Sequence, residues 1–184
     1  MPIYVALLRG INVSGQKIIK MEDLKNAFES LHYEHVVTYI QSGNVVFGSA
    51  ASNTALLQTQ IKNKLLKTFG FEIPIIVKTL KEIEETIKRN PFKKIKAQQG
   101  EKLHVTFLSG NPAKAAGDSL AAIKNDVDEI RLIGSEVYIL VRKGYGTTLF
   151  SNIFIEKKLA VSATTRNWAT VEKLLCLAKT AAAI

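Results

Sequence analysis

The order of strand-like and helix-like patterns in residues 3–77 is the feature that most limits the folds open to this chain. Ile3–Leu8 is a short, continuous apolar run followed by Gly10 and a polar loop, as is typical of a buried strand. In residues 21–31 the apolar side chains recur at i, i+3, i+4 and i+7, which places them on one face of a helix. The chain is therefore predicted to open with a strand and an amphipathic helix.

The next segments continue this alternation. β-Branched and aromatic residues fill 36–40 and 45–47 with a Ser-Gly pair between them, which predicts a hairpin. Apolar residues at helical spacing in 57–69 predict a second helix, and residues 73–77 predict a fourth strand. The order strand, helix, strand, strand, helix, strand is that of the split βαβ, or ferredoxin-like, unit. The sequence thus predicts an α+β protein.

A boundary between two units is predicted near the middle of the chain. Thr79 and Glu82 have the spacing of a capping box that begins one more helix, and the Asn-Pro pair at 90–91 ends it. Residues 88–100 contain five basic residues and no acidic residue, which favours an exposed connector. We predict one unit over residues 1–90 and a second over 101–184.

The second half of the chain repeats a pattern of the first. The run HVTFLSGN at 104–111 matches YVALLRGI at 4–11 with a spacing of 100 residues, and a hairpin is predicted over 130–141. Helices are then predicted over 149–159 and 168–178, with no fourth strand. We predict two ferredoxin-like units in tandem, the second modified by extra C-terminal helices. Chance similarity of the short runs is the alternative.

Charge and cysteine content narrow the surroundings in which the protein acts. Lys and Arg total 25 against 16 Asp and Glu, a formal charge of +9 at pH 7, which favours anionic partners. Cys176 is the only cysteine, which excludes a disulfide framework, and its predicted place in a helix favours a buried, inert thiol. No stretch approaches the ~20 consecutive apolar residues of a membrane span. We expect a soluble, cytoplasmic protein with no membrane partner.

Two polar segments are predicted to meet at one edge of the first sheet. Arg9 and Asn12 follow the first strand, and Gln41, Ser42 and Asn44 form the turn between the second and third strands. In a split βαβ unit the third strand neighbours the first, so the two segments share an edge. Glycines beside them expose backbone N–H groups, and a guanidinium binds phosphate or carboxylate in bidentate fashion. The alternative is that these side chains cap loops and satisfy backbone groups.

A third polar segment, TTRNW at residues 164–168, precedes the last predicted helix. A Thr or Asn N-cap explains most of this run. Arg166 and Asn167 beside the exposed amides of that helix would also favour an anion. We therefore predict a pocket formed by the RGIN, QSGN and TTRNW segments that binds an anionic small molecule or nucleotide.

No cofactor or metal site is predicted. His32, His35 and His104 lie far from cysteines or acidic residues at metal-ligand spacing. The run from Gly10 to Lys17 approaches a phosphate-binding P-loop, but Lys does not follow its second glycine directly. The polar loops also lack carboxylates, so no general base and no catalytic residue can be assigned.

Two other classes of function stay open. One is an enzyme that uses Arg9 and Arg166 electrostatically, with proton chemistry supplied by substrate or water. The other is a non-specific nucleic-acid binder that uses surface lysines at 62–67 and 88–96. Residues 45–47 lack the aromatic pattern of RNA-recognition modules, which weakens the second class. The oligomeric state is not predicted.

Three runs, YVALLRGINVSG, TYIQSGNVVF and ATTRNWATVEKL, together resemble a bacterial family known as domain of unknown function 1697. The resemblance extends over essentially the whole chain. It implies an α+β protein with ferredoxin-like halves and no established activity. Where relatives tend to carry Gly-x-Gly-Arg-Ser-Lys, this chain ends the run with Thr147, Thr148 and Leu149. If the basic residues of relatives bind an anion, that contact is absent or altered here.

Overall fold

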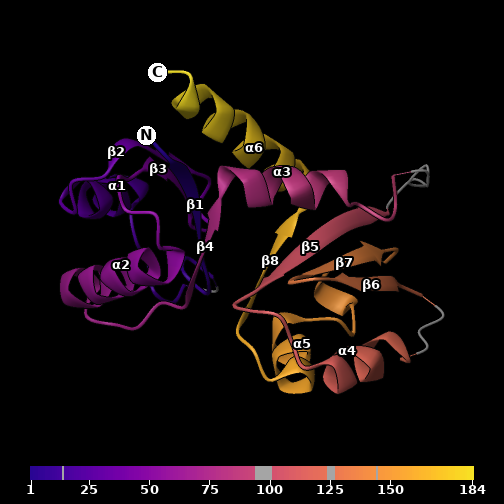
Figure 1. Cartoon of the computed structure of the whole chain (residues 1–184). Coiled ribbons are helices and arrows are strands. Elements are labelled where there is room, and N and C mark those ends of the chain that lie inside the picture. Colours follow the sequence, from indigo (N-terminus) through magenta and orange to yellow (C-terminus); the bar gives the residue numbers. More distant parts are fainter. Residues whose placement is uncertain (14, 94–100, 124–126, 144) are drawn as a thin grey trace. The chain divides into compact units, whose positions relative to one another are not determined.

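The structure is a computed structural model of the chain. It describes residues 1–13, 15–93, 101–123, 127–143 and 145–184. Within these residues the chain is an α+β protein with two four-stranded antiparallel sheets and six α-helices (Figure 1). The chain divides into two compact units: the first contains residues 1–85 and 172–184, and the second contains residues 86–171.

The first unit holds the sheet predicted from the N-terminal half. Its elements are β1 (Ile3–Leu8), α1 (Met21–Glu29), β2 (Glu34–Tyr39), β3 (Asn44–Gly48), α2 (Thr54–Phe69) and β4 (Ile75–Thr79). The strands pair in the order β2-β3-β1-β4, and every pairing is antiparallel. The third strand therefore lies beside the first, as predicted, and the β2–β3 turn lies where β1 ends.

Aromatic rings fill the core between this sheet and its two helices. The ring of Tyr33 stacks on that of Phe47 with centroids 4.6 Å apart, and Phe28 contacts the edge of Phe47 at 5.4 Å. Leu57 and Ile61 of α2 are fully buried in the same cluster. The apolar surface that these side chains remove from water is the main contribution to the stability of this unit.

Capping interactions at the ends of α2 and of the helix that follows β4 are those that the sequence predicts. The predicted capping box is confirmed, because the Glu82 carboxylate accepts from the Thr79 amide at 2.8 Å and the Thr79 hydroxyl accepts from the Glu82 amide at 3.1 Å. This box begins α3 (Leu80–Lys88). Gly70 ends α2 in the left-handed conformation, with φ of 80°.

The second unit also holds a four-stranded sheet. Its elements are β5 (Lys102–Leu108), α4 (Lys114–Ala121), β6 (Glu129–Ile133), β7 (Glu136–Val141), the 3₁₀ turn Tyr145–Thr147, α5 (Asn152–Leu159) and β8 (Ala163–Asn167). The strand order is β6-β7-β5-β8. The last helix, α6 (Trp168–Ala182), begins directly after β8.

The prediction that no fourth strand follows the second hairpin is wrong. β8 pairs with β5, and Arg166 lies opposite Val105. Its sequence, ATTRN, has no apolar alternation, and its Thr and Asn residues are typical of a helix N-cap, so the strand escaped the sequence pattern.

The repeat at a spacing of 100 residues extends to backbone hydrogen bonds at the end of the first strand of each unit. In both units, the last residue of that strand donates to the hairpin turn, and the next residue donates to the segment before the fourth strand. The four N–H to O=C bonds are Leu8 to Gly43 (2.8 Å), Leu108 to Ser135 (2.9 Å), Arg9 to Pro74 (2.9 Å) and Ser109 to Ser162 (2.8 Å). The two strand-loop segments thus adopt the same backbone scheme.

Two further observations concern single elements. Cys176 is exposed on α6, so the prediction of a buried thiol is wrong; Leu174 and Ala178 on the same helix are buried instead. Among the described residues no helix combines the length and the apolar character needed to cross a membrane.

Candidate functional site

The segments after β1 and between β2 and β3 meet in the first unit. We call residues 9–13, 15–20 and 41–44 the loop edge. The Leu8 amide donates to the Gly43 carbonyl at 2.8 Å, and the Asn12 side chain donates to the Gln41 carbonyl at 2.9 Å. The structure therefore brings Arg9 and Asn12 beside the turn, as the strand order predicted.

Asn12 holds this edge together. Its Nδ2 donates to the carbonyls of both Ile19 and Gln41, at 3.0 and 2.9 Å, and its Oδ1 accepts from the Ile19 amide at 2.8 Å. Its φ of 54° is left-handed, a conformation that Asn tolerates better than most residues. Both amide protons form hydrogen bonds within the protein, so the role of Asn12 is to hold the two segments of the loop edge in position.

Asn44 and Ser42 close the turn. Asn44 is fully buried, and its Nδ2 donates to the Tyr39 carbonyl at 3.0 Å and to the Ser42 hydroxyl at 3.1 Å. The side chains of Gln41 and Ser42 themselves are exposed at the surface of the edge. Of the two, Gln41 offers both an amide donor and a carbonyl acceptor there.

The loop edge contains three cationic residues. Arg9 is half-buried, and Lys20 is exposed directly before α1. Lys17 donates from Nζ to the Glu72 carbonyl at 2.7 Å and lies 5.7 Å from the centre of the Phe71 ring. Sequence reasoning placed Lys17 only in a failed P-loop pattern, because a contact with residues 55 positions away leaves no local signal.

Gly10 leaves the backbone of the edge open. Its φ is 70°, and no atom lies within 4 Å of the position that a Cβ would take. A ligand can therefore approach the peptide groups next to Arg9 without displacing a side chain. The residues of the edge include the cations Arg9, Lys17 and Lys20. The acidic residues Glu22 and Asp23 lie in the first turn of α1, outside the edge.

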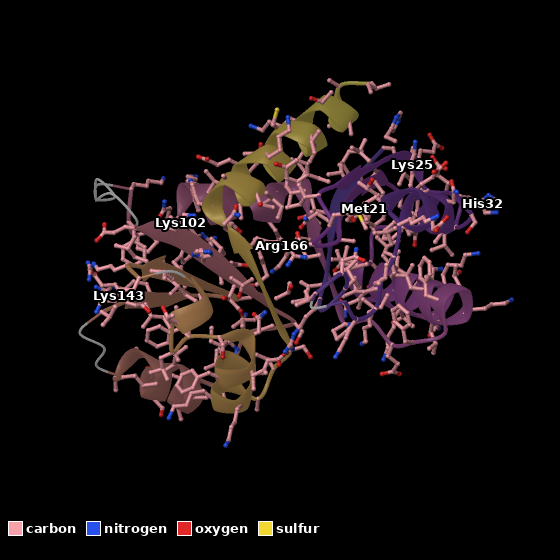
Figure 2. All side chains as sticks on the ribbon, turned by 180° about the vertical axis from the view of Figure 1, so that it is seen from behind. Met21, Lys25, His32, Lys102, Lys143 and Arg166 are labelled. Atoms are coloured by element: carbon pink, nitrogen blue, oxygen red, sulfur yellow. The ribbon has the colours of Figure 1, made fainter. Side chains whose placement is uncertain are left out.

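The third predicted segment lies in the second unit, on β8. The Arg166 side chain is buried, and its Nη1 donates to the Thr164 hydroxyl at 2.8 Å and to the Thr165 carbonyl at 2.9 Å (Figure 2). Asn167 accepts from the Thr170 amide at 2.8 Å and so caps α6. That Arg166 and Asn167 share one pocket with Arg9 stays a prediction.

A separate polar cluster of the second unit explains how this chain accommodates its Thr147, Thr148 and Leu149 run. Asp128 is buried; its carboxylate accepts from the Arg142 amide at 3.0 Å and from the Thr148 hydroxyl at 2.6 Å. Thr148 takes the position of the Ser in the pattern of relatives and also carries a hydroxyl. Hydrogen bonds to Glu129 and Glu101 raise the pKa of the Arg142 guanidinium. This cluster fixes the start of β6 to the end of β7.

The described residues give little support for acid–base or metal chemistry. Burial lowers the pKa of His104. A hydrogen bond between its Nδ1 and the backbone carbonyl of Lys102 opposes this shift, and the Lys102 charge acts in the same direction as burial. In the part of the chain that the structure describes, no group of three or more His, Cys, Asp or Glu side chains is placed so that it could hold a metal ion.

Comparison with known proteins identifies the family. Residues 1–138 match the model of a family described as protein of unknown function, DUF1697. The chain belongs to this family. The resemblance to this family is thereby confirmed. The matched residues contain the first two of the three sequence runs, and the third, at residues 163–174, lies outside them.

Among solved structures, this DUF1697 chain is similar to the conserved bacterial protein SP0830 from Streptococcus pneumoniae. The two share 19% sequence identity over 96% of this chain and 98% of that one, with a TM-score of 0.75. At this identity the likeness shows a shared fold. No curated protein matches the chain.

Proposed function

We propose that the protein binds an anionic small molecule or nucleotide at the loop edge of the first unit. Arg9 supplies a planar guanidinium for a phosphate or carboxylate, and Gln41 and Ser42 supply polar groups on the opposite segment. Lys17 and Lys20 add positive potential. The proposal assigns Asn12 and Asn44 to positioning, because their amide protons are used within the protein.

The observation that carries this proposal is the junction of the two segments beside Gly10. The Asn12 to Gln41 hydrogen bond joins them, and the open space at Gly10 leaves backbone groups accessible. A rigid, preformed set of donors binds an anion with little loss of conformational freedom.

A thermal-shift series tests the proposal with three probes: ADP, citrate and inorganic phosphate. A ligand that binds only the native state raises stability by RT ln(1 + [L]/Kd). We expect at least one probe to raise the melting temperature of the wild type, and Arg9→Ala to lose that rise. Lys25→Ala is the matched control, because Lys25 pairs with Glu29 on α1 outside the edge (Figure 2).

Two results would contradict the proposal. One is the absence of stabilisation by all three probes, and the other is an unchanged rise in a well-folded Arg9→Ala protein. Binding to single-stranded or duplex nucleic acid is the alternative outcome, recognised by a slope of about 0.9 log units of affinity per log unit of salt for each phosphate neutralised in B-DNA. A small ligand with one or two charges shows a much shallower dependence.

We also propose that residues 1–90 and 101–184 each contain one ferredoxin-like unit, and that the protein acts in the cytoplasm. The βαββαβ element order and the strand orders β2-β3-β1-β4 and β6-β7-β5-β8 support the first statement. The single cysteine in 184 residues supports the second.

A further inference from the structure

The second unit contains a cavity that the proposed function leaves unused. It has a volume of about 320 Å³ and lies between α4 and the β6–β7 hairpin. It is lined by the small or apolar residues Gly117, Ala121 and Leu132 and by the charged residues Lys114 and Asp118, among others. This volume is at the lower end of the range of small-molecule sites.

The cavity occupies the place in the second unit that the loop edge occupies in the first. In each unit the end of the first strand donates to the hairpin turn, from Leu8 to Gly43 and from Leu108 to Ser135. The segment after β5 and the turn that contains Gly134 both line the cavity. The same backbone scheme therefore supports two surfaces that carry different side chains.

Small residues in and next to α4 account for the shape of the cavity. A Cβ atom on Gly117 would lie 2.9 Å from Cδ2 of Leu132, so a glycine at this position lets the helix approach β6 closely. Ala113 and Ala121, one turn before and one turn after Gly117, are also too small to fill the space beside the helix. Small and apolar residues of α4 and β6 therefore line the cavity together with the charged residues Lys114 and Asp118.

Two residues of opposite charge that line the cavity lie one helical turn apart. Lys114 and Asp118 are i and i+4 on α4, so they share a face. In the described parts of the chain neither side chain forms an ion pair or a side-chain hydrogen bond, and both are exposed. Lys before the acidic residue is the less favourable order for a helical pair, which leaves both groups available.

We propose that this cavity binds a free amino acid with an aliphatic side chain. The carboxylate of the amino acid pairs with Lys114, its ammonium group pairs with Asp118, and its side chain covers Leu132 and Ala121. The ligand must carry both charges, because a simple anion would meet the Asp118 carboxylate and a simple cation would meet Lys114. This proposal does not depend on binding at the loop edge.

Titration of the full chain with L-leucine, followed by amide NMR shifts, tests the proposal. We expect shifts confined to residues of α4, β6 and the β6–β7 turn at millimolar leucine. Leucinamide lacks the carboxylate and 4-methylpentanoate lacks the ammonium group, so each should bind about tenfold more weakly or worse. Lys114→Gln should abolish the preference for leucine over leucinamide, and Asp118→Asn the preference over 4-methylpentanoate.

A pair of variants on the same helix supplies the control for shape. Ala121→Phe fills the cavity and should abolish the shifts, whereas Ala115→Phe changes an exposed residue that does not line it and should retain them. Absence of shifts with leucine overturns the proposal. Equal binding of leucine and its two analogues, or shifts that survive in a folded Ala121→Phe protein, also overturns it.

Discussion

A Cβ atom on Gly43 would lie 2.8 Å from the Cβ atom of Leu8, so the turn between β2 and β3 can close over the end of β1 only with glycine. The φ of Gly43 is also left-handed, at 78°. We expect Gly43→Ala to lower the free energy of unfolding by about 2–4 kcal/mol, from strained backbone and a forced shift of packed atoms. Gly70 has a similar φ but open space around it, so Gly70→Ala should cost about 1–2 kcal/mol. Denaturant titration compares the two; equal losses would contradict the close contact.

Removing the side chain of Asn12 should loosen the loop edge. Asn12→Ala removes three hydrogen bonds and leaves the amide of buried Ile19 without its acceptor, so we expect a loss of about 2–3 kcal/mol. Asn12→Asp keeps the acceptor for the Ile19 amide but turns a carboxylate oxygen toward the Ile19 and Gln41 carbonyls, so it should cost at least as much as Asn12→Ala. Gln41→Ala leaves the bonded backbone carbonyl in place and should change stability by about 0.5 kcal/mol or less. Denaturant midpoints decide this order, and a neutral Asn12→Ala would refute it.

The buried imidazole of His104 should make the second unit sensitive to acid. Burial lowers its pKa in the folded state below the ordinary value of 6.5, so the unfolded chain takes up a proton first as the pH falls. Its contribution to stability is therefore complete above the unfolded pKa and declines as the pH drops below about 6.5. We expect the difference in unfolding free energy between wild type and His104→Gln to change between about pH 7.5 and 5. A difference that is constant over this range would show that His104 titrates as in an open chain.

The Thr148 hydroxyl should contribute more to the stability of the fold than the hydroxyl of its neighbour Thr147. Thr148→Val removes a donor to buried Asp128 and an acceptor for the Phe150 amide, so a loss of about 1–3 kcal/mol is expected. Thr148→Ser retains the hydroxyl and should cost little. Thr147→Val affects a longer, exposed hydrogen bond to the Lys143 carbonyl and serves as the control. Thermal unfolding of the three variants measures the order, and equal midpoints for Thr148→Val and Thr147→Val would contradict it.

Elements with a local signal could be predicted from the sequence, whereas elements that depend on a distant partner could not. The capping box of Thr79 and Glu82 involves residues three positions apart, so its residue types suffice to recognise it. β8 is a strand because β5 supplies its hydrogen-bond partners, and nothing in ATTRN itself indicates that pairing. The exposure of Cys176 likewise depends on which face of α6 is covered, a choice that spacing alone left undecided.

The loop edge shows the same division. The meeting of Asn12 with the turn at Gln41 follows from strand order, which the pattern of six elements predicted correctly. The positioning roles of Asn12 and Asn44 and the contact of Lys17 with the Glu72 carbonyl depend on the exact path of each loop. Residue type tells that an amide can donate, but only geometry tells whether its protons are already used.

The division of the chain gives its synthesis a fixed order of events. The first unit takes residues 172–184 as well as 1–85, and the whole of the second unit stands between them in the sequence. On the ribosome, residues 172–184 are therefore made only after the second unit has been translated. The first unit therefore cannot be completed until the second unit has been synthesised. Ribosome-bound chains halted before residue 172 should contain all residues of the second unit but lack residues 172–184 of the first.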